Sequence, residues 1–141
     1  MNKNEITNED FIHLHVHSDD SNLRLKDSIA KVEDIIKYAN QLGNKGVAIT
    51  DHECLSNHVL AINTVNKLKK EKELPKDFKL ILGNEIYLVD KNKTNQLIKD
   101  KERVTFYHCL LLSKDEIGHQ QLRELSSRAW RDNYFSYRGM N

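Results

Sequence analysis

The amino-acid sequence predicts an α/β fold built on a mainly parallel sheet. Short apolar runs of strand length alternate along the chain with longer segments whose apolar residues recur at helical spacing. The turns between them are short, which is typical of βα units that join parallel strands through helices. At 141 residues, the chain is long enough for one domain with its own core.

Each element follows from its local pattern. Strands are expected at residues 11–15, 46–50, 78–82 with an extension at 86–89, and 104–112. Residues 18–26 are polar and predict a loop. Helices are expected over residues 29–42, where Gly43 supplies the stop, from about Ser56 to Pro75, and after the capping box that Ser113 and Glu116 form.

Composition excludes several classes of protein. The net charge is +1 with 30% charged residues, so the surface is mixed and not polybasic. No run approaches the ~20 apolar residues of a membrane span, and residues 1–10 lack a signal-peptide core and are expected to form a flexible leader. Two cysteines do not make a disulfide framework. We therefore expect a cytoplasmic protein with reduced thiols and no membrane partner.

Three histidines mark the first predicted strand. His13, His15 and His17 stand two residues apart, so in an extended segment their imidazoles line one face. Imidazole is the commonest neutral metal ligand. His13 lies deeper in the strand than the other two, and for it a packing role and a site role stay equally open.

Later strands also end in, or carry, residues that bind metals. Asp51 and His52 follow the second strand, Glu85 follows the third, and His108 lies in the fourth. If the strands run parallel, their carboxyl ends meet at one rim, where such sheets place their chemistry. Imidazoles with carboxylates suit Zn, Mn or Fe, and bound divalent ions favour hydrolysis of a phosphoester. A single histidine in a strand is usually a core residue, but four strands with ligand-type residues predict a metal site.

The remaining cysteines and histidines give weaker evidence of a functional site. Cys54 and Cys109 are expected to be small core residues, and His58 and His119 to have solvated or capping roles on helices. The chain contains no P-loop, no Gly-rich phosphate loop and no G-x-S-x-G elbow, which disfavours kinases, nucleotide switches and serine hydrolases.

The strings around these residues resemble a known domain family. They are HLHVHS at residues 13–18, ITDH at 49–52, LGNEIY at 82–87 and YHCLLL at 107–112. Their order and spacing resemble the PHP (polymerase and histidinol phosphatase) domain, in the version at the N-terminus of the bacterial and phage DNA polymerase III alpha subunit. The resemblance implies a partial, distorted (β/α)7 barrel of the TIM-like kind, with only the first βα units in this chain.

By position, the resemblance also implies a ligand set for up to three divalent ions. The implied metal ligands are His15, His17, Asp27, His52, Glu85 and His108. The resemblance implies Glu85 as a bridging carboxylate and Asp51 as the partner that orients His52, and these two acids are the expected catalytic residues. The stretch from His17 to Asp27 is longer than is usual in the family.

The resemblance implies an enzyme of the DNA-directed DNA polymerase family whose PHP domain hydrolyses phosphodiesters, as in 3′–5′ exonuclease proofreading. The implied partners are DNA, as a 3′ end or a single strand, and the remaining polymerase domains. Two alternatives stay open: a stand-alone phosphatase acting on a small phosphomonoester such as histidinol phosphate, and a non-catalytic structural module.

The resemblance also bears on how much of the domain the chain contains. The family's remaining ligands, a later histidine and an Asp-x-His pair, would lie beyond residue 141. Residues 1–141 are therefore expected to be the N-terminal part of a PHP domain that is truncated at its C-terminus. An incomplete barrel exposes sheet edges, which favours pairing into a homo-oligomer.

Overall fold

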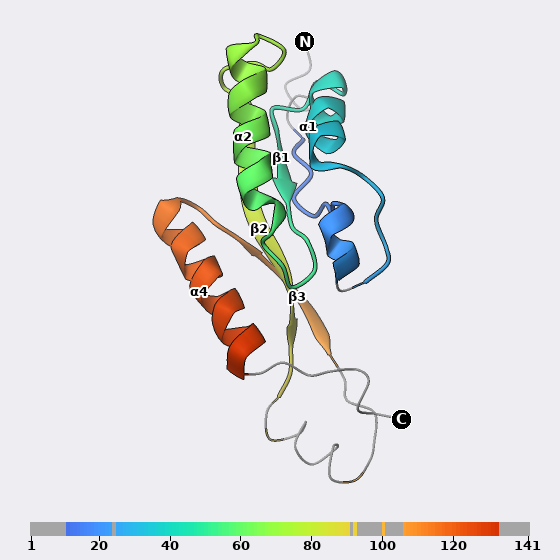
Figure 1. The fold of residues 1–141 in the computed structure, drawn as a ribbon, viewed down its shortest axis with the longest axis vertical. Helices are drawn as coiled ribbons and strands as arrows, with labels where there is room; N and C mark the ends of the chain where they lie inside the picture. Colours follow the sequence, from blue (N-terminus) through green and yellow to red (C-terminus); the bar gives the residue numbers. More distant parts are fainter. Residues whose placement is uncertain (1–10, 24, 91, 93–99, 101–105, 133–141) are drawn as a thin grey trace, which may run out of the picture.

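The protein has a mixed α/β fold (Figure 1). The computed structural model describes residues 11–23, 25–90, 92, 100 and 106–132. Along these residues the elements are η2 (Asp19–Leu23), α1 (Val32–Gln41), β1 (Gly46–Ile49), α2 (Asn57–Lys70), β2 (Lys79–Leu88), β3 (Tyr107–Leu112) and α4 (Glu116–Asp132). None of the described helices combines the length and apolar character needed to span a bilayer.

The three strands form one sheet in the order β1-β2-β3, in which β2 has a different partner along each half. Its first half pairs in parallel with β1, so that Ile49 lies opposite Leu82. Its second half pairs with β3 in antiparallel fashion, from Gly83 opposite Leu112 to Leu88 opposite Tyr107. The prediction of a mainly parallel sheet is therefore wrong for β3. An apolar run specifies a strand but not its direction.

Gly83 allows β2 to continue as one strand of ten residues instead of the two runs that the pattern predicts. A Cβ at this position would lie 2.6 Å from the Leu111 carbonyl oxygen and 2.8 Å from Thr50 Cγ2. These separations are too short for any side chain, so glycine is needed where β2 passes from one partner strand to the other.

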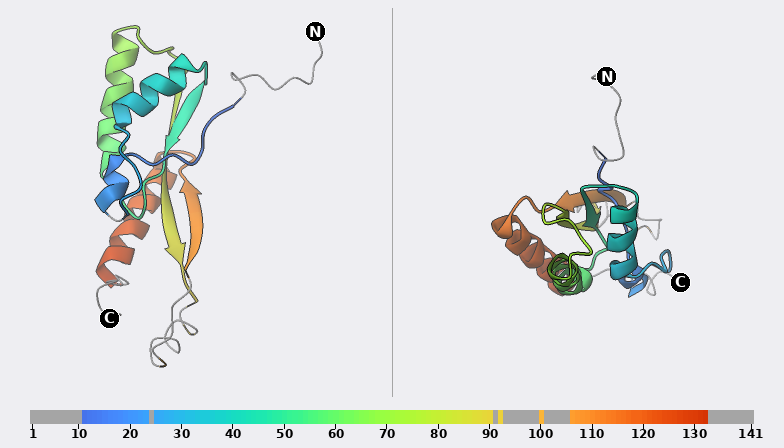
Figure 2. Two further views of the ribbon diagram at one scale, coloured as in Figure 1. Left: turned by 90° about the vertical axis from the view of Figure 1, so that its right-hand side faces the viewer. Right: turned by 90° about the horizontal axis from the view of Figure 1, so that it is seen from above.

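The core lies between the sheet and the helices that cover one of its faces (Figure 2). Apolar side chains of α1, β1 and α2 meet there, and the buried cluster is Val32, Ile36, Ala39, Val47, Ile49, Ala61, Val65, Leu68, Leu74 and Phe78. The predicted helix at 29–42 begins later, at Val32, and Ile29 is 94% exposed. Ile29 therefore fits the helical spacing of apolar residues in the sequence but lies before the first residue of the helix.

Helix α4 packs less closely than its apolar stripe predicts. Among its described residues only Leu122 is buried, and Ile117 is largely exposed. The predicted capping box is wrong: Asp115, not Ser113, accepts a hydrogen bond from the Gly118 backbone N–H at 2.8 Å. The Ser113 hydroxyl instead donates to the Leu82 carbonyl, which attaches the start of the helix to β2.

The expected first strand is reduced to a single bridge between His13 and Val47. The segment still runs beside β1, because the amides of Ala48 and Thr50 donate to the carbonyls of His13 and Val16. Phe11, at its start, is half exposed. The prediction of a strand at residues 11–15 therefore overstated the regularity and the burial of this segment.

Candidate metal centre

Six side chains with metal-binding chemistry meet beside the sheet, although they come from five separate parts of the chain. They fall into three overlapping groups, and in each group one ligand atom per residue lies within 4.8 Å of the others. The groups are His15, His17 and Glu85; His17, Asp27 and His52; and His52, Glu85 and His108. The structure thus brings together all six residues that the sequence suggested as ligands.

His15 and His17 reach the cluster from the segment beside β1. Their Nε2 atoms lie 3.0 Å apart, and each also faces Glu85 Oε2, at 2.5 Å and 2.7 Å respectively. The two-residue spacing turns both rings to the same side, as an extended backbone requires. His13 belongs to none of the three groups, and its ring packs against Phe11 with centroids 4.7 Å apart.

Asp27 and His52 form the second side of the cluster. Asp27 Oδ2 lies 3.0 Å from His52 Nε2 and 3.2 Å from His17 Nδ1. Burial lowers the pKa of His52, although the Glu85 carboxylate opposes this shift. A neutral imidazole at pH 7 has a free lone pair for a metal ion.

Glu85 and His108 come from neighbouring antiparallel strands. Glu85 lies opposite Leu110 and His108 opposite Tyr87, so the two side chains are diagonal neighbours on one face of the hairpin. His108 Nδ1 contacts Glu85 Oε1. Burial raises the pKa of Glu85, but hydrogen bonds from His108, His15 and His17 outweigh it and lower the pKa to about 2.

The donor set fits divalent metal ions. Ligand atoms around a tetrahedral ion bound at about 2.1 Å lie ~3.4 Å from one another, close to the separations within these groups. His15 Nε2 faces both a nitrogen and a carboxylate oxygen, and a single ring proton cannot satisfy both contacts. Such crowding of lone pairs indicates a site built for cations.

Asp51 has a different place from the one implied for it. It is 1% exposed, and its carboxylate accepts hydrogen bonds from the Ser18 amide at 2.5 Å, the Ser18 hydroxyl at 2.6 Å and the Ser21 hydroxyl at 3.0 Å. The described contacts of this carboxylate therefore go to the segment after His17 and not to the ring of His52. Asp51 fixes the chain that presents His17, and Ser21 in turn accepts from the His52 amide.

Asn84 holds the turn that carries His52. Its side-chain amide donates to the carbonyl of Asp51, which precedes His52, and to the carbonyl of Cys54, which follows it, both at 2.9 Å. Glu53, between them, has a φ of 53°, which is unusual for a residue with a side chain. The Glu53 amide donates to the Glu85 carbonyl at 2.8 Å. These bonds maintain a strained turn directly beside His52.

Sequence reasoning missed an aromatic wall and misplaced two histidines. Tyr87 stacks on His52, with ring centroids 5.9 Å apart, and meets His108 edge-on at 4.7 Å. Alternation along β2 from Glu85 was a signal that could have placed Tyr87 on this face.

The sequence had suggested a solvated or capping role for His58, but this residue is buried. Its ring links two groups: Nε2 lies 2.9 Å from the Gly83 carbonyl oxygen, and Nδ1 lies 3.0 Å from His119 Nε2.

The cysteines stay outside the cluster. Burial raises the pKa of the Cys54 thiol to about 11, so it remains protonated and is a poor metal ligand. Cys54 is a core residue as expected, whereas Cys109 is only partly buried.

The fold and this cluster define a mixed α/β domain with a set of side chains that could hold divalent metal ions. The PHP domain model matches residues 13–140, and the chain belongs to this family. Among curated proteins, it is 50% identical over 125 residues to a protein of Bacillus phage SPbeta described as DNA-directed DNA polymerase, covering 86% of this chain and 9% of that protein. It is 35% identical over 128 residues to DNA polymerase III subunit alpha of Borreliella burgdorferi, covering 89% and 10% respectively.

The chain therefore corresponds to the PHP portion of polymerases of the DNA polymerase III alpha type and spans about a tenth of the length of the relatives it matches. Among solved structures, it is similar to a Bifidobacterium adolescentis protein assigned as a metal-dependent phosphoesterase. That similarity has 23% sequence identity and a TM-score of 0.49, and it covers 85% of this chain and 34% of the other.

Proposed function

We propose that the six clustered residues form a divalent metal centre that hydrolyses phosphodiesters of DNA. The observation that carries this proposal is the convergence of four imidazoles and two carboxylates into three overlapping groups of ligand atoms. Imidazoles bind metal ions in their neutral form, so a ligand set of four imidazoles and two carboxylates would carry about two negative charges, which one divalent ion neutralises. Further cations would leave a net positive centre, and such a centre attracts a phosphate group.

The side chains have separate roles in this proposal. Bound divalent ions supply a water molecule of lowered pKa and neutralise the charge on the phosphate. Glu85 presents one oxygen towards His15 and His17 and the other towards His108, as a bridging ligand would. Asp27 supplies the second carboxylate, beside His52. Asp51 acts as a positioning residue through Ser18 and Ser21, and hydrolysis by an activated water needs no side-chain nucleophile.

The relatives support a substrate class and partners for this proposal. Because the matched proteins are DNA polymerases, we infer that the natural substrate is a DNA 3′ end or single strand and that the remaining polymerase domains adjoin this one. This favours 3′–5′ exonuclease action over the stand-alone phosphatase and the structural module. The choice among Zn, Mn and Fe, the partial barrel, a cytoplasmic location and self-association stay predictions.

Metal binding by a Glu85→Gln variant tests the proposal. The substitution preserves shape but removes the charge that three histidines share, so we expect metal affinity to fall by at least ~100-fold, beyond the 10–100-fold typical of outer-shell changes. Calorimetric titration with Zn²⁺ and Mn²⁺ measures this, together with release of nucleotides from 3′-labelled single-stranded DNA and of phosphate from histidinol phosphate.

Glu33→Gln is the matched control, because Glu33 lies on α1 and pairs with Lys37 at 2.7 Å, away from the cluster. It should bind metal like the unchanged protein. A wild-type protein that binds neither ion would contradict the metal centre. Hydrolysis of histidinol phosphate without attack on DNA would instead support the phosphatase alternative.

A further inference from the structure

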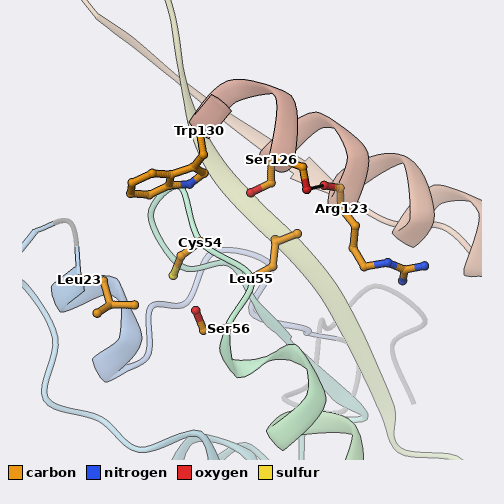
Figure 3. Close-up of a pocket in the computed structure, with 8 residues that line it drawn as sticks. Leu23, Cys54, Leu55, Ser56, Arg123, Ser126 and Trp130 are labelled. Carbon is orange, nitrogen blue, oxygen red and sulfur yellow. Dashed lines mark hydrogen bonds between the residues drawn. The ribbon is translucent and has the colours of Figure 1, made fainter. Parts of the chain in front are cut away.

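We propose that a pocket between α4 and the turn after His52 (Figure 3) binds single-stranded DNA by stacking a base on Trp130 and holding a phosphate at Arg123. The pocket has a volume of about 650 Å³, within the range of small-ligand sites. Its walls include Leu23, Leu55, Ser56, Arg123, Ser126 and Trp130. This inference rests on the proposed function, since it adds a subsite for the same substrate.

Trp130 provides the stacking surface. Its indole N–H donates to the Glu53 carbonyl at 2.7 Å, which fixes the ring, yet 42% of the residue stays exposed. Leu23 and Leu55 add apolar walls to the pocket. Stacking on an aromatic ring is tolerant of sequence because every base has a π-face, and it is the usual means of holding a single strand.

Arg123 provides the positive charge. Of the three arginines on α4, Arg128 and Arg131 contact carboxylates of the same helix, Glu124 and Asp132. Arg123 instead contacts the neutral acceptor His119 Nδ1 at 2.7 Å, and no carboxylate lies within ion-pair distance of it among the residues that the structure describes. Its charge is therefore free to complement a phosphate rather than an acidic side chain.

The spacing along α4 suits a strand more than a lone nucleotide. Trp130 and Arg123 are seven residues apart, which places them on one face of the helix and ~10 Å apart along its axis. Figure 3 shows the two side chains at opposite ends of the pocket with Ser126 between them. Successive bases of a strand are separated by about 3.4 Å in stacked DNA, so the pocket spans more than one of them.

The pocket is connected to the metal centre through the turn that follows His52. Glu53, which accepts the Trp130 hydrogen bond, immediately follows His52, and its amide bonds to Glu85. A strand held at Trp130 therefore passes along the turn whose other end carries a proposed ligand.

The fluorescence of Trp130, the only tryptophan in the chain, reports directly on the proposed stacking. Oligo(dT) is titrated into the protein in EDTA, so that neither metal nor hydrolysis contributes. We expect saturable quenching, with Arg123→Gln weakening the apparent Kd by roughly tenfold and lowering the slope of log K against log salt by about 0.7. Arg128→Gln, on the same helix but outside the pocket, is the matched control and should leave the quenching curve nearly unchanged.

Anisotropy of a labelled oligonucleotide extends the test to Trp130 itself. Trp130→Phe should retain binding, whereas Trp130→Ala should raise the Kd about tenfold or more, as expected when the stacking of one base is lost. The proposal is overturned if quenching is absent, if Arg128→Gln weakens binding as much as Arg123→Gln, or if oligoglutamate competes as well as DNA, which would indicate an acidic-peptide site. Because these measurements use no metal, quenching without hydrolysis would refute only the proposed function, and hydrolysis without quenching would refute only the pocket.

Discussion

Replacing Asp51 by asparagine separates a positioning role from a catalytic one. The buried carboxylate accepts three hydrogen bonds from Ser18 and Ser21. Asparagine keeps one acceptor oxygen but turns its amide N–H₂ towards the Ser18 hydroxyl. That hydroxyl already accepts from Asn57 at 2.7 Å, so its own proton is left without an acceptor.

The cost follows from these bonds. One hydrogen bond to a charged group, worth about 1.5–3 kcal/mol, is lost and a buried donor is left unsatisfied, partly offset because no charge is buried any longer. We expect the free energy of unfolding to fall by roughly 2–3 kcal/mol, equivalent to a fall in Tm on the order of 10 °C. Urea titration followed by circular dichroism measures this, and Asp77→Asn, at an exposed loop position, is the control.

Metal binding supplies the decisive contrast. If Asp51 positions the chain and does not contact the metal, the folded Asp51→Asn protein should bind Zn²⁺ with no more than a ~10–100-fold loss, as for an outer-shell group. An unfolding free energy within ~0.5 kcal/mol of wild type, combined with complete loss of metal binding, would refute this reasoning and indicate that Asp51 is itself a metal ligand.

Two further predictions concern pH and backbone strain. Burial lowers the pKa of both His58 and His119, and Asp51 and Arg123 are the charged groups that act on this pair. The unfolded chain binds protons at these two histidines more readily than the folded chain does. The free energy of unfolding should therefore keep its full value above about pH 6.5 and fall as the pH drops below it. His119→Gln should flatten that dependence in urea titrations at pH 7.5 and 5.5, and an unchanged slope would contradict the linkage. At the strained turn, the Glu53→Val variant should be about 1–2 kcal/mol less stable than the Glu53→Gly variant in the same assay. Both variants lose the carboxylate, but only glycine accepts the positive φ without strain. Equal stabilities of the two variants would show that the turn is unstrained.

The convergence of the candidate ligands was predictable, but part of the reasoning behind it was not correct. His52 follows β1 at its carboxyl end, as expected for a parallel strand. His108 instead lies near the amino end of β3, and it reaches the same place because β3 runs in the opposite direction. Ligand-type residues at strand ends identified the site, whereas strand direction depends on tertiary pairing that a local pattern does not contain.

Residues whose roles depend on distant contacts were not predictable from local patterns. Asp27 lies in an irregular segment, and only the resemblance to the family suggested it. His58 has the spacing of an ordinary helix residue, and its burial results from the packing of α4 against α2 and β2. Asn84 likewise gave no signal of its role, because its two carbonyl partners belong to another turn.

Pairing within the β2–β3 hairpin fixes the positions of Glu85 and His108 independently of the chain that connects the two strands. Six residue pairs, ending at Leu88 and Tyr107, fix the register of Glu85 and His108. Residues 89–106 connect the two strands in the sequence. Doubling the length of such a connection costs only about 0.6 kcal/mol in closure entropy. Related domains can therefore differ in the length of this connection at little cost in stability, while the paired strands keep the two ligands in their places.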